Sequence, residues 1–301
     1  MLVEKTIKCL ICGKSQFVCI HHGTRDIPDI NIMKCTNCGM VLLDNISYNT
    51  KEWYSGGGML KDAYRAVTDN VEQIKWEEWI QDTKQDDDRR YKVLKELCRG
   101  RSVLEFGCGN GGFLRRIKRV ASDVSGVELL EESQEKIGQE GIKIYRDLRQ
   151  VDKKYDVICM FMVIEHLNNP DEELEEIYKL LNPNGLLICE TPNAEDALIS
   201  KYNCKAFQDF TYWSEHVLLF NSDTLEKVML RNRYKTKKNT QIQRYSLANH
   251  LYWLSNEKPG GHMKWTEFNE QRLDSAYAEK LIQLGIADTL WYEGVKISNN
   301  I

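Results

Sequence analysis

The sequence predicts an α/β fold, a doubly wound sheet that follows a small cysteine-rich module. Three observations predict it. A short apolar run at 102–106 passes through a glycine-dense turn at 107–112 into a helical pattern. Apolar segments then alternate with helical ones, which is typical of parallel strands joined by crossover helices. Two CxxC pairs stand ahead of this region.

Composition bounds the functional classes. The 301 residues suffice for one large core and a small appendage. A net charge of −4 and a pI near 6.0 argue against a dominant nucleic-acid-binding face. The longest apolar run, 157–164, is too short to cross a bilayer, and residues 1–5 lack the apolar stretch of a signal peptide. Cysteines inside the expected strands indicate a reducing compartment, so we expect a cytoplasmic protein.

The first 46 residues predict a zinc ribbon. Each CxxC pair is followed by a glycine, and about 22 residues separate the pairs, as in four-cysteine metal sites. So short a segment needs the metal in order to fold, and four thiolates leave no open position, so the Zn²⁺ is expected to be structural. Disulfides are the alternative, and Cys19, His21 and His22 lack ligand spacing. The expected metal ligands are Cys9, Cys12, Cys35 and Cys38.

Residues 47–100 are expected to form an aromatic and glycine-rich connector followed by helices. Around Trp53–Gly58 the connector lacks capping residues and reads as irregular. The stretch 70–98 is rich in helix formers, and Asp86–Asp88 is expected to mark a break as a solvated helix start. Tyr54 and Tyr64 are aromatic candidates for the wall of a pocket, with ordinary packing as the alternative.

The remaining elements alternate along the chain from 101 to 301. The expected strands cover 102–106, 124–129, 143–146, 155–162, 186–191, 234–243 and 288–296. The expected helices cover 131–141, 170–181 and 222–232, with Asn169 and Ser222 as N-caps. This alternation predicts a doubly wound sheet.

The glycine-rich turn predicts a nucleotide-type cofactor. Gly107, Gly109 and Gly112, with Glu128 about 20 residues further on, fit the dinucleotide fingerprint. Glu105 decides between cofactors, because a carboxylate at the strand end repels a pyrophosphate but suits a ligand that carries an ammonium and a sulfonium. At these residues the chain resembles the class I S-adenosylmethionine-dependent methyltransferases. A glycine turn that merely packs is the alternative.

Further segments refine this resemblance. Residues 163–170, with Glu165-His166, and 190–193 look like the subset that methylates oxygen or carbon of small hydroxylated metabolites and sugars. The ribbon is similar to that of zinc-containing sugar C-methyltransferases, although this chain is shorter and lacks their extra C-terminal domain. The resemblance implies a seven-stranded Rossmann-like sheet and methyl transfer to a sugar or nucleotide sugar, in surface glycan or secondary-metabolite assembly.

The resemblance also implies site residues. His166 is the expected base, Glu165 would orient it or the substrate, and His216 is a second catalytic candidate. The expected contacts to S-adenosylmethionine are Glu105, Gly107, Cys108, Gly109, Asn110, Gly111, Phe113, Glu128, Leu129, Asp147, Leu148, Phe161 and Met162.

Two segments, 192–221 and 245–285, are expected to form a lid over the carboxyl edge of the sheet, where ligands bind. Aromatic and polar side chains there suit a sugar ring, and plain packing explains them equally well. The expected substrate contacts are Tyr212, Tyr245, Asn249, His250, Trp253 and His262.

Three other functions are consistent with parts of the sequence. An RNA-modifying methyltransferase is disfavoured by the acidic pI, so no nucleic-acid partner is expected. A quinone-type phenol O-methyltransferase shares the Glu-His segment, but the ribbon and the lid disfavour it. A non-catalytic scaffold that keeps the cofactor fold is disfavoured by the intact Glu105 and Glu165-His166.

Overall fold

The computed structural model describes residues 7–58, 61 and 75–297, and its larger sheet has seven strands among these residues. They are β4 (Ser102–Phe106), β5 (Asp123–Val127), β6 (Lys143–Tyr145), β7 (Tyr155–Phe161), β8 (Leu181–Pro192), β10 (Tyr234–Ile242) and β11 (Thr289–Lys296). Across the sheet their order is β10-β11-β8-β7-β4-β5-β6. Neighbours from β6 to β8 are parallel, and β11 lies antiparallel between β8 and β10. The predicted α/β class and its seven-stranded sheet are confirmed.

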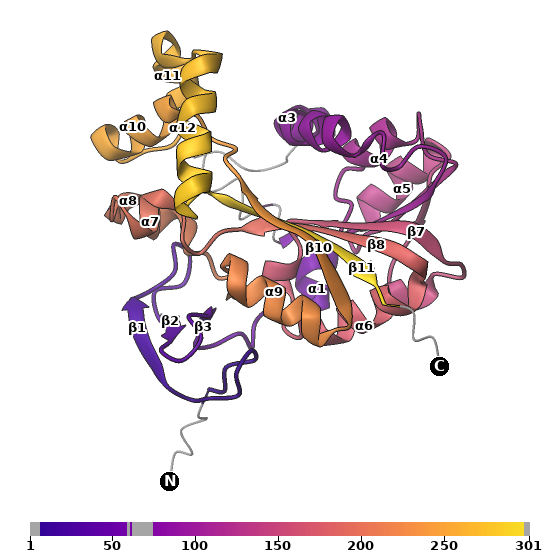
Figure 1. Ribbon diagram of the computed structural model, residues 1–301, viewed down its shortest axis with the longest axis horizontal. Helices are drawn as coiled ribbons and strands as arrows, with labels where there is room; N and C mark the ends of the chain where they lie inside the picture. The colour runs from indigo at the N-terminus through magenta and orange to yellow at the C-terminus, as the bar shows by residue number, and fades with distance from the viewer. Residues whose placement is uncertain (1–6, 59–60, 62–74, 298–301) are drawn as a thin grey trace.

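Helices cover both faces of this sheet (Figure 1). One face carries α3 (Trp76–Leu94), α4 (Gly112–Ile117) and α5 (Glu131–Gln139), and the other carries α6 (Pro170–Leu180) and α9 (Ser222–Arg231). Successive strand residues supply the two cores, because side chains alternate across a sheet. Val103 and Val157 pack with the helices of the first face, whereas Leu104 and Ile158 pack with those of the second.

Several local predictions need correction. Asp86–Asp88 does not break a helix but lies inside the continuous α3, where Asp87 is only 4% exposed and pairs with Arg90 and Arg116. The segment expected to be irregular contains the short helix α1 (Lys51–Ser55), which is capped by Thr50. Asn221, rather than Ser222, caps α9. Tyr64 lies outside the described residues.

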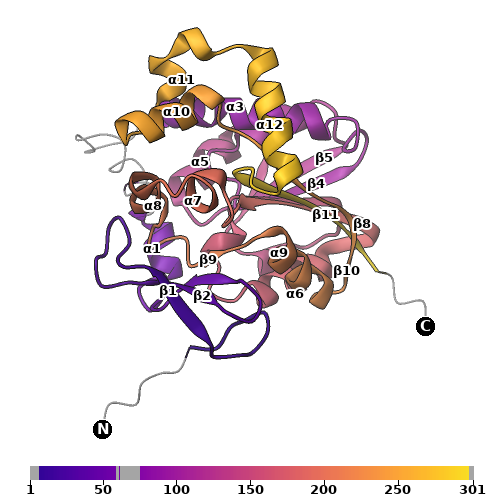
Figure 2. The same cartoon turned by 60° about the vertical axis from the view of Figure 1, so that its left-hand side comes forward.

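The N-terminal segment shares a sheet with the rest of the chain (Figure 2). This sheet has the order β1 (Phe17–His21), β2 (Ile32–Cys35), β3 (Val41–Leu43), β9 (Leu218–Leu219). Its last strand comes from the 192–221 segment and pairs antiparallel with β3. The 192–221 segment therefore joins the N-terminal module, residues 7–58, to the main domain.

A second group of helices stands beyond one end of the large sheet (Figures 1 and 2). It consists of α7 (Ala197–Ser200), α8 (Lys205–Thr211), α10 (Leu247–Asn256), α11 (Gly261–Lys264) and α12 (Gln271–Leu284). The helical prediction for 245–285 is confirmed. Within the described part of the chain, every helix is too short or too polar to cross a bilayer.

Candidate functional site

A pocket of about 340 Å³ lies at the carboxyl ends of β4, β5 and β7, the edge at which α/β sheets bind ligands. Several of its lining residues, which we call the donor side, are those that the sequence predicts as contacts of S-adenosylmethionine. They are Gly107, Gly109, Glu128, Leu129, Asp147, Leu148 and Met162. The remaining lining residues, which we call the acceptor side, include Asn49, Tyr54, His166, Asn168 and Asn169, while Lys51 reaches Asp147 of the donor side.

Two glycines of the turn at 107–112 let its backbone line the pocket. Gly107 has a φ of 71°, and a Cβ at this position would lie 2.4 Å from the Val163 side chain. Gly109 has a φ of 54°, and its Cβ would lie 3.3 Å from the Trp79 ring. Residues that carry a side chain rarely adopt a positive φ. Glycine at both positions therefore lets the loop present its main chain to a ligand.

Glu128 follows β5 and turns its carboxylate toward this loop. It accepts hydrogen bonds from the backbone N–H of Gly109 at 2.8 Å and of Leu130 at 2.9 Å. Burial raises the pKa of Glu128, and these backbone donors oppose the rise. Each carboxylate oxygen keeps further acceptor capacity, which is what a pair of ribose hydroxyls requires.

Asp147 lies at the other end of the donor side, where it caps the 3₁₀ turn η1 (Leu148–Gln150). Lys51 reaches it from α1 with an Nζ–Oδ2 distance of 2.8 Å. Although burial opposes the change, this contact and those from Arg149 lower the pKa of Asp147 to about 2. The N-terminal module therefore contacts the pocket wall expected to receive adenine. Nothing in the sequence signals that Lys51 would do so.

Glu105 is not among the pocket-lining residues. Its side chain is 4% exposed, and burial, with Asp87 nearby, raises its pKa well above the usual range. Its Oε2 finds no hydrogen-bond partner among the described residues. Glu105 is therefore a buried side chain outside the lining of the pocket, and its contact with the cofactor stays a prediction. The other expected contacts that do not line the pocket are Cys108, Asn110, Gly111, Phe113 and Phe161.

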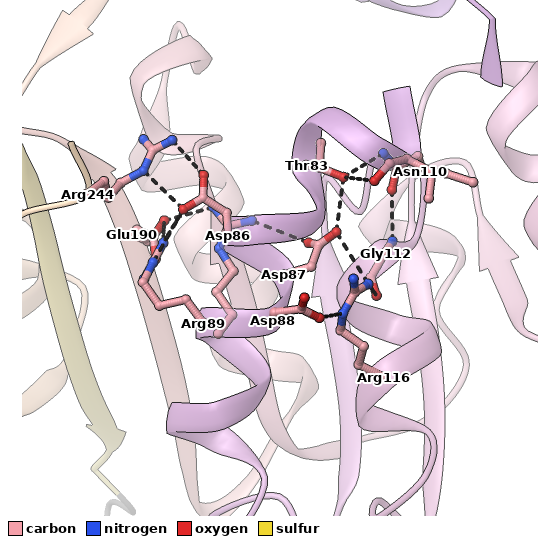
Figure 3. Close-up of polar contacts among 12 residues, drawn as sticks. Thr83, Asp86, Asp87, Asp88, Arg89, Asn110, Gly112, Arg116, Glu190 and Arg244 are labelled. Atoms are coloured by element: carbon pink, nitrogen blue, oxygen red, sulfur yellow. Dashed lines mark hydrogen bonds and ion pairs between the residues drawn. The ribbon is translucent and has the colours of Figure 1, made fainter. Parts of the chain in front are cut away.

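Asn110 and Gly112 hold the loop against α3 (Figure 3). The Asn110 amide donates to Thr83 Oγ1 at 2.9 Å and to the Trp79 carbonyl at 3.2 Å, and its Oδ1 accepts the Gly112 N–H. The Thr83 hydroxyl in turn donates to Asp87 at 3.0 Å. The Asn110 side chain therefore attaches the loop to α3 and does not line the pocket.

A buried charge network connects α3 to β8 and to the start of the lid (Figure 3). Arg89 and Arg90 both donate to the Glu190 carboxylate at 2.8–3.0 Å, and Glu190 is fully buried. Arg244 donates to Asp86 at 2.6 Å. Charged runs in a helix usually face solvent, so the sequence did not indicate this network.

His166 is held in one orientation by the chain. Its Nδ1–H donates to the Glu215 carbonyl at 2.8 Å, and its Nε2 lies 3.9 Å from Oε1 of Glu165. Burial lowers the pKa of His166 to about 4, whereas it raises the pKa of Glu165 to about 7. The other Glu165 oxygen accepts the Thr191 hydroxyl at 2.9 Å. A neutral imidazole with Nδ1 protonated has its basic lone pair on Nε2.

The other residues near His166 differ in their access to the pocket. The His216 ring packs 5.2 Å from the His166 ring but does not line the pocket. Tyr54 does line it, and its ring lies 6.1 Å from that of His166 in an edge-to-face arrangement. Asn49 donates to the Tyr54 hydroxyl at 2.9 Å. Tyr54 is one of the two aromatic residues, with Tyr64, that the sequence offers for the pocket wall.

The residues that the sequence predicts as substrate contacts lie outside the lining of this pocket, so their role stays a prediction. The Asn249 side chain accepts the N–H groups of Gly260 and Gly261, and Trp253 packs on Phe207 and Phe210. Polar and aromatic side chains here build the lid itself. None of the six predicted contacts lines the described pocket: Tyr212, Tyr245, Asn249, His250, Trp253 and His262.

A separate cluster of four thiols lies in the N-terminal module. The Sγ atoms of Cys9, Cys12, Cys35 and Cys38 lie within 4.8 Å of one another. The closest pairs are 3.4 and 3.6 Å apart, near the roughly 3.8 Å edge of a tetrahedral zinc–thiolate site. The N–H groups of Gly13 and Gly39 close both turns on the carbonyls of Cys9 and Cys35. All ten cysteines are free thiols, so the donor set fits a structural zinc ion.

A sequence model of the methyltransferase domain family matches residues 77–235. A Mycolicibacterium smegmatis protein named "probable S-adenosylmethionine-dependent methyltransferase" is 32% identical over 109 residues, covering 34% of this chain and 42% of that protein. A ubiquinone biosynthesis O-methyltransferase of Pelagibacter ubique is 27% identical over 161 residues, which cover 50% of this chain and 64% of that protein. The aligned regions thus cover less than two thirds of either relative. A solved S-adenosylmethionine-dependent methyltransferase of Thermotoga maritima has a TM-score of 0.49 at 20% identity, covering 74% and 94% of the two chains.

Proposed function

Because this chain belongs to the methyltransferase family, we propose that it transfers the methyl group of S-adenosylmethionine to a hydroxyl of a sugar or nucleotide sugar. Family membership confirms the predicted class of enzyme. The acceptor and the role of each residue are the parts that we propose. The observation that carries the proposal is the pocket itself, which brings His166 together with the residues that we expect to contact the cofactor.

The donor side of the pocket suits S-adenosylmethionine. Glu128 would bind the ribose hydroxyls, Asp147 and Leu148 would contact the adenine, and the main chain at Gly107 and Gly109 would lie along the methionine portion. When bound, this donor supplies a methyl group on a positively charged sulfur. The buried carboxylate of Glu105 lies beneath the same loop, so it would act on that charge from a distance rather than by contact.

His166 is neutral at pH 7, so its Nε2 can receive the proton of an acceptor hydroxyl, although the lowered pKa makes it a weaker base than an ordinary histidine. Nε2 and Oε1 of Glu165 are 3.9 Å apart, too far for a direct hydrogen bond, and Oε1 has no partner among the described residues. As the oxygen–carbon bond forms and the carbon–sulfur bond breaks, the hydroxyl proton would pass to Nε2. Positioning of the two reactants would supply much of the rate.

The acceptor side favours a hydroxylated ring. Asn49, Asn168 and Asn169 contribute amide donors and acceptors, and Tyr54 contributes an aromatic ring and a hydroxyl. Sugars present hydroxyl edges and apolar ring faces, so both kinds of group have a use. A carbon acceptor remains the alternative, since it would need the same base to remove a proton beside a carbonyl group.

A phenol is the second candidate acceptor. The Pelagibacter ubique relative is named a ubiquinone biosynthesis O-methyltransferase, and it aligns over half of this chain. A phenol is far more acidic than a sugar hydroxyl, so it would depend less on the base. The dependence of turnover on His166 therefore separates the two acceptors.

Nucleotide sugars and catechols, each mixed with labelled S-adenosylmethionine, would identify the acceptor by the methyl group gained. With a sugar we expect His166→Ala to reduce turnover at least 100-fold, the lower range for a general base. Calorimetry should show unchanged binding of S-adenosylmethionine. His22→Ala, which removes an exposed histidine of the N-terminal module, is the control. Full turnover by His166→Ala would refute the base assignment.

A further inference from the structure

All three hydrogen-bonding groups of Ser214 are held by the N-terminal module, residues 7–58. Asp26 accepts the Ser214 N–H at 3.1 Å through one carboxylate oxygen and the hydroxyl at 2.5 Å through the other. The Tyr48 hydroxyl donates to the Ser214 carbonyl at 2.6 Å. A residue with every polar group held by one neighbouring segment has little freedom to move independently of it.

Backbone contacts extend this attachment to both sides of Ser214. The Arg25 N–H donates to the Tyr212 carbonyl at 2.8 Å, and the Leu43 N–H donates to the Val217 carbonyl at 3.3 Å. β9 then continues the sheet of the module by pairing with β3. The whole 212–219 segment is therefore fixed by the module rather than by the main domain alone.

The residue after Ser214 holds the expected base. The Glu215 carbonyl accepts the Nδ1–H of His166 at 2.8 Å. In a neutral imidazole this bond decides which nitrogen carries the proton, and so which one can accept another. Trp53 of the same module also donates to the Glu215 carboxylate at 2.5 Å.

We propose that the N-terminal module positions His166 through the Ser214–Glu215 segment, with Asp26 and Tyr48 as positioning residues. The module holds the Glu215 carbonyl in place, that carbonyl keeps the proton on Nδ1, and Nε2 is left as the acceptor. Four-cysteine metal binding would then be linked to catalysis, because a module that does not fold cannot hold Ser214. The catalytic consequence rests on the proposed function, whereas the orientation of the imidazole does not.

Nitrogen-15 NMR of the histidine rings measures the tautomer directly and needs no acceptor substrate. The full chain has six histidines, and the His166 signals are those that disappear in His166→Ala. We expect the Nδ1–H form to predominate at pH 7 in the wild type. In the Asp26→Ala/Tyr48→Phe double variant its ratio to the Nε2–H form should fall about fivefold, the effect of weakening one ordinary hydrogen bond. Asp26→Asn, which keeps one acceptor oxygen, should restore part of the ratio.

Asp44→Ala is the matched control. Asp44 lies in the same module and also accepts two hydrogen bonds, but both come from Asn31. It should leave the His166 tautomer unchanged. An unchanged ratio in the double variant would overturn the proposal, and so would an equal shift in Asp44→Ala.

Two further measurements separate a failure of the positioning proposal from a failure to fold and from a failure of the base assignment. If the double variant does not fold, Tyr48→Phe alone decides, because it removes one hydroxyl and should still shift the ratio. Binding of S-adenosylmethionine, measured by calorimetry, should stay at the wild-type level in every variant. Retained methyl transfer by His166→Ala would refute the base assignment, while a shifted tautomer would still support the positioning.

Discussion

Arg90 donates from Nη2 to Oε1 of Glu190 across 2.8 Å and so joins α3 to the carboxyl end of β8 inside the protein. Arg89 binds the same carboxylate through both of its terminal nitrogens. Burial opposes ionisation of Glu190, but the two arginines prevail and lower its pKa. The helix that supports the glycine-rich loop is therefore attached to the sheet by buried charges.

Removing one partner of this network should destabilise the protein strongly. Glu190→Ala removes the buried carboxylate that Arg89 and Arg90 share, and loss of one partner of a buried pair costs about 3–5 kcal/mol. Arg89 would keep its pair with Asp86, so we expect the lower end of this range. Arg99→Ala is the control, because its pair with Glu96 is exposed and should contribute at most about 1 kcal/mol. Urea unfolding at pH 7 measures both free energies. Equal effects of the two variants would contradict the network's role.

Acid should reproduce part of the effect of Glu190→Ala. The pKa of Glu190 is lower in the folded protein than in the unfolded chain. Such a group contributes its full stabilisation of the folded state above the unfolded pKa, and this contribution is lost as the pH falls from the unfolded pKa to the folded pKa. The gap in stability between the wild type and Glu190→Ala should therefore narrow below about pH 4.3, the pKa of an unperturbed glutamate. A gap that stays constant down to pH 3 would argue against an ionised Glu190.

Gly112 is a position in the glycine-rich turn where a methyl group has no space. A Cβ there would lie 1.9 Å from Oδ2 of Asp87, which is itself buried. We expect Gly112→Ala to cost at least the 1–3 kcal/mol typical of overpacking, and to weaken binding of S-adenosylmethionine. Gly138→Ala, in α5, is the control, because a Cβ there meets nothing within 4 Å. It should stabilise the protein by about 0.5–1 kcal/mol.

Periodicity and glycine spacing were sufficient to predict the α/β sheet, because strands buried on both faces must be apolar. They also brought Glu128, Asp147 and His166 to one pocket, since all three follow strands that end at the same edge. The burial of the Glu105 side chain could not be predicted from periodicity or glycine spacing. Whether a side chain at a strand end faces the ligand or the interior depends on α3, which packs over it.

The lid shows a second limit of sequence reasoning. Asn249 and Trp253 have the chemistry of a sugar site, yet both are used in packing and in a turn. Tyr54 and Lys51 do reach the pocket, but they come from a segment without helical or strand periodicity. Long-range placement of a connector depends on the contacts that it makes across the fold. No local pattern reports those contacts.

The cysteine cluster gives a prediction for the metal. Cys12→Ser should release about one zinc ion per chain and lower the melting temperature, since bound metal stabilises the folded module. Cys19→Ser is the matched control, because Cys19 lies outside the cluster and should leave the zinc content unchanged. Native mass spectrometry counts the metal. Wild-type protein that carries no zinc, or an equal loss in both variants, would contradict a four-thiolate site.

Glu165 should make its own contribution to the pH dependence of stability. Burial raises its pKa from 4.5 to about 7, so the folded protein keeps a proton that the unfolded chain releases within that window. Because the folded state binds more protons there, this group lowers stability as the pH rises from about 4.5 to 7. The buried His166, with a pKa lowered from 6.5 to about 4, acts in the opposite direction over nearly the same range.

Glu165→Gln separates the two contributions, since glutamine does not titrate and has nearly the same shape. The stability of this variant relative to wild type should rise steadily between pH 4.5 and 7 and level off above pH 7. Urea unfolding at half-unit pH steps measures the difference, in which the histidines cancel. A difference that does not change with pH would mean that Glu165 titrates alike in both states. In that case the Glu165 carboxyl group would be ionised at pH 7, and a carboxylate rather than a carboxylic acid would lie 3.9 Å from the neutral His166.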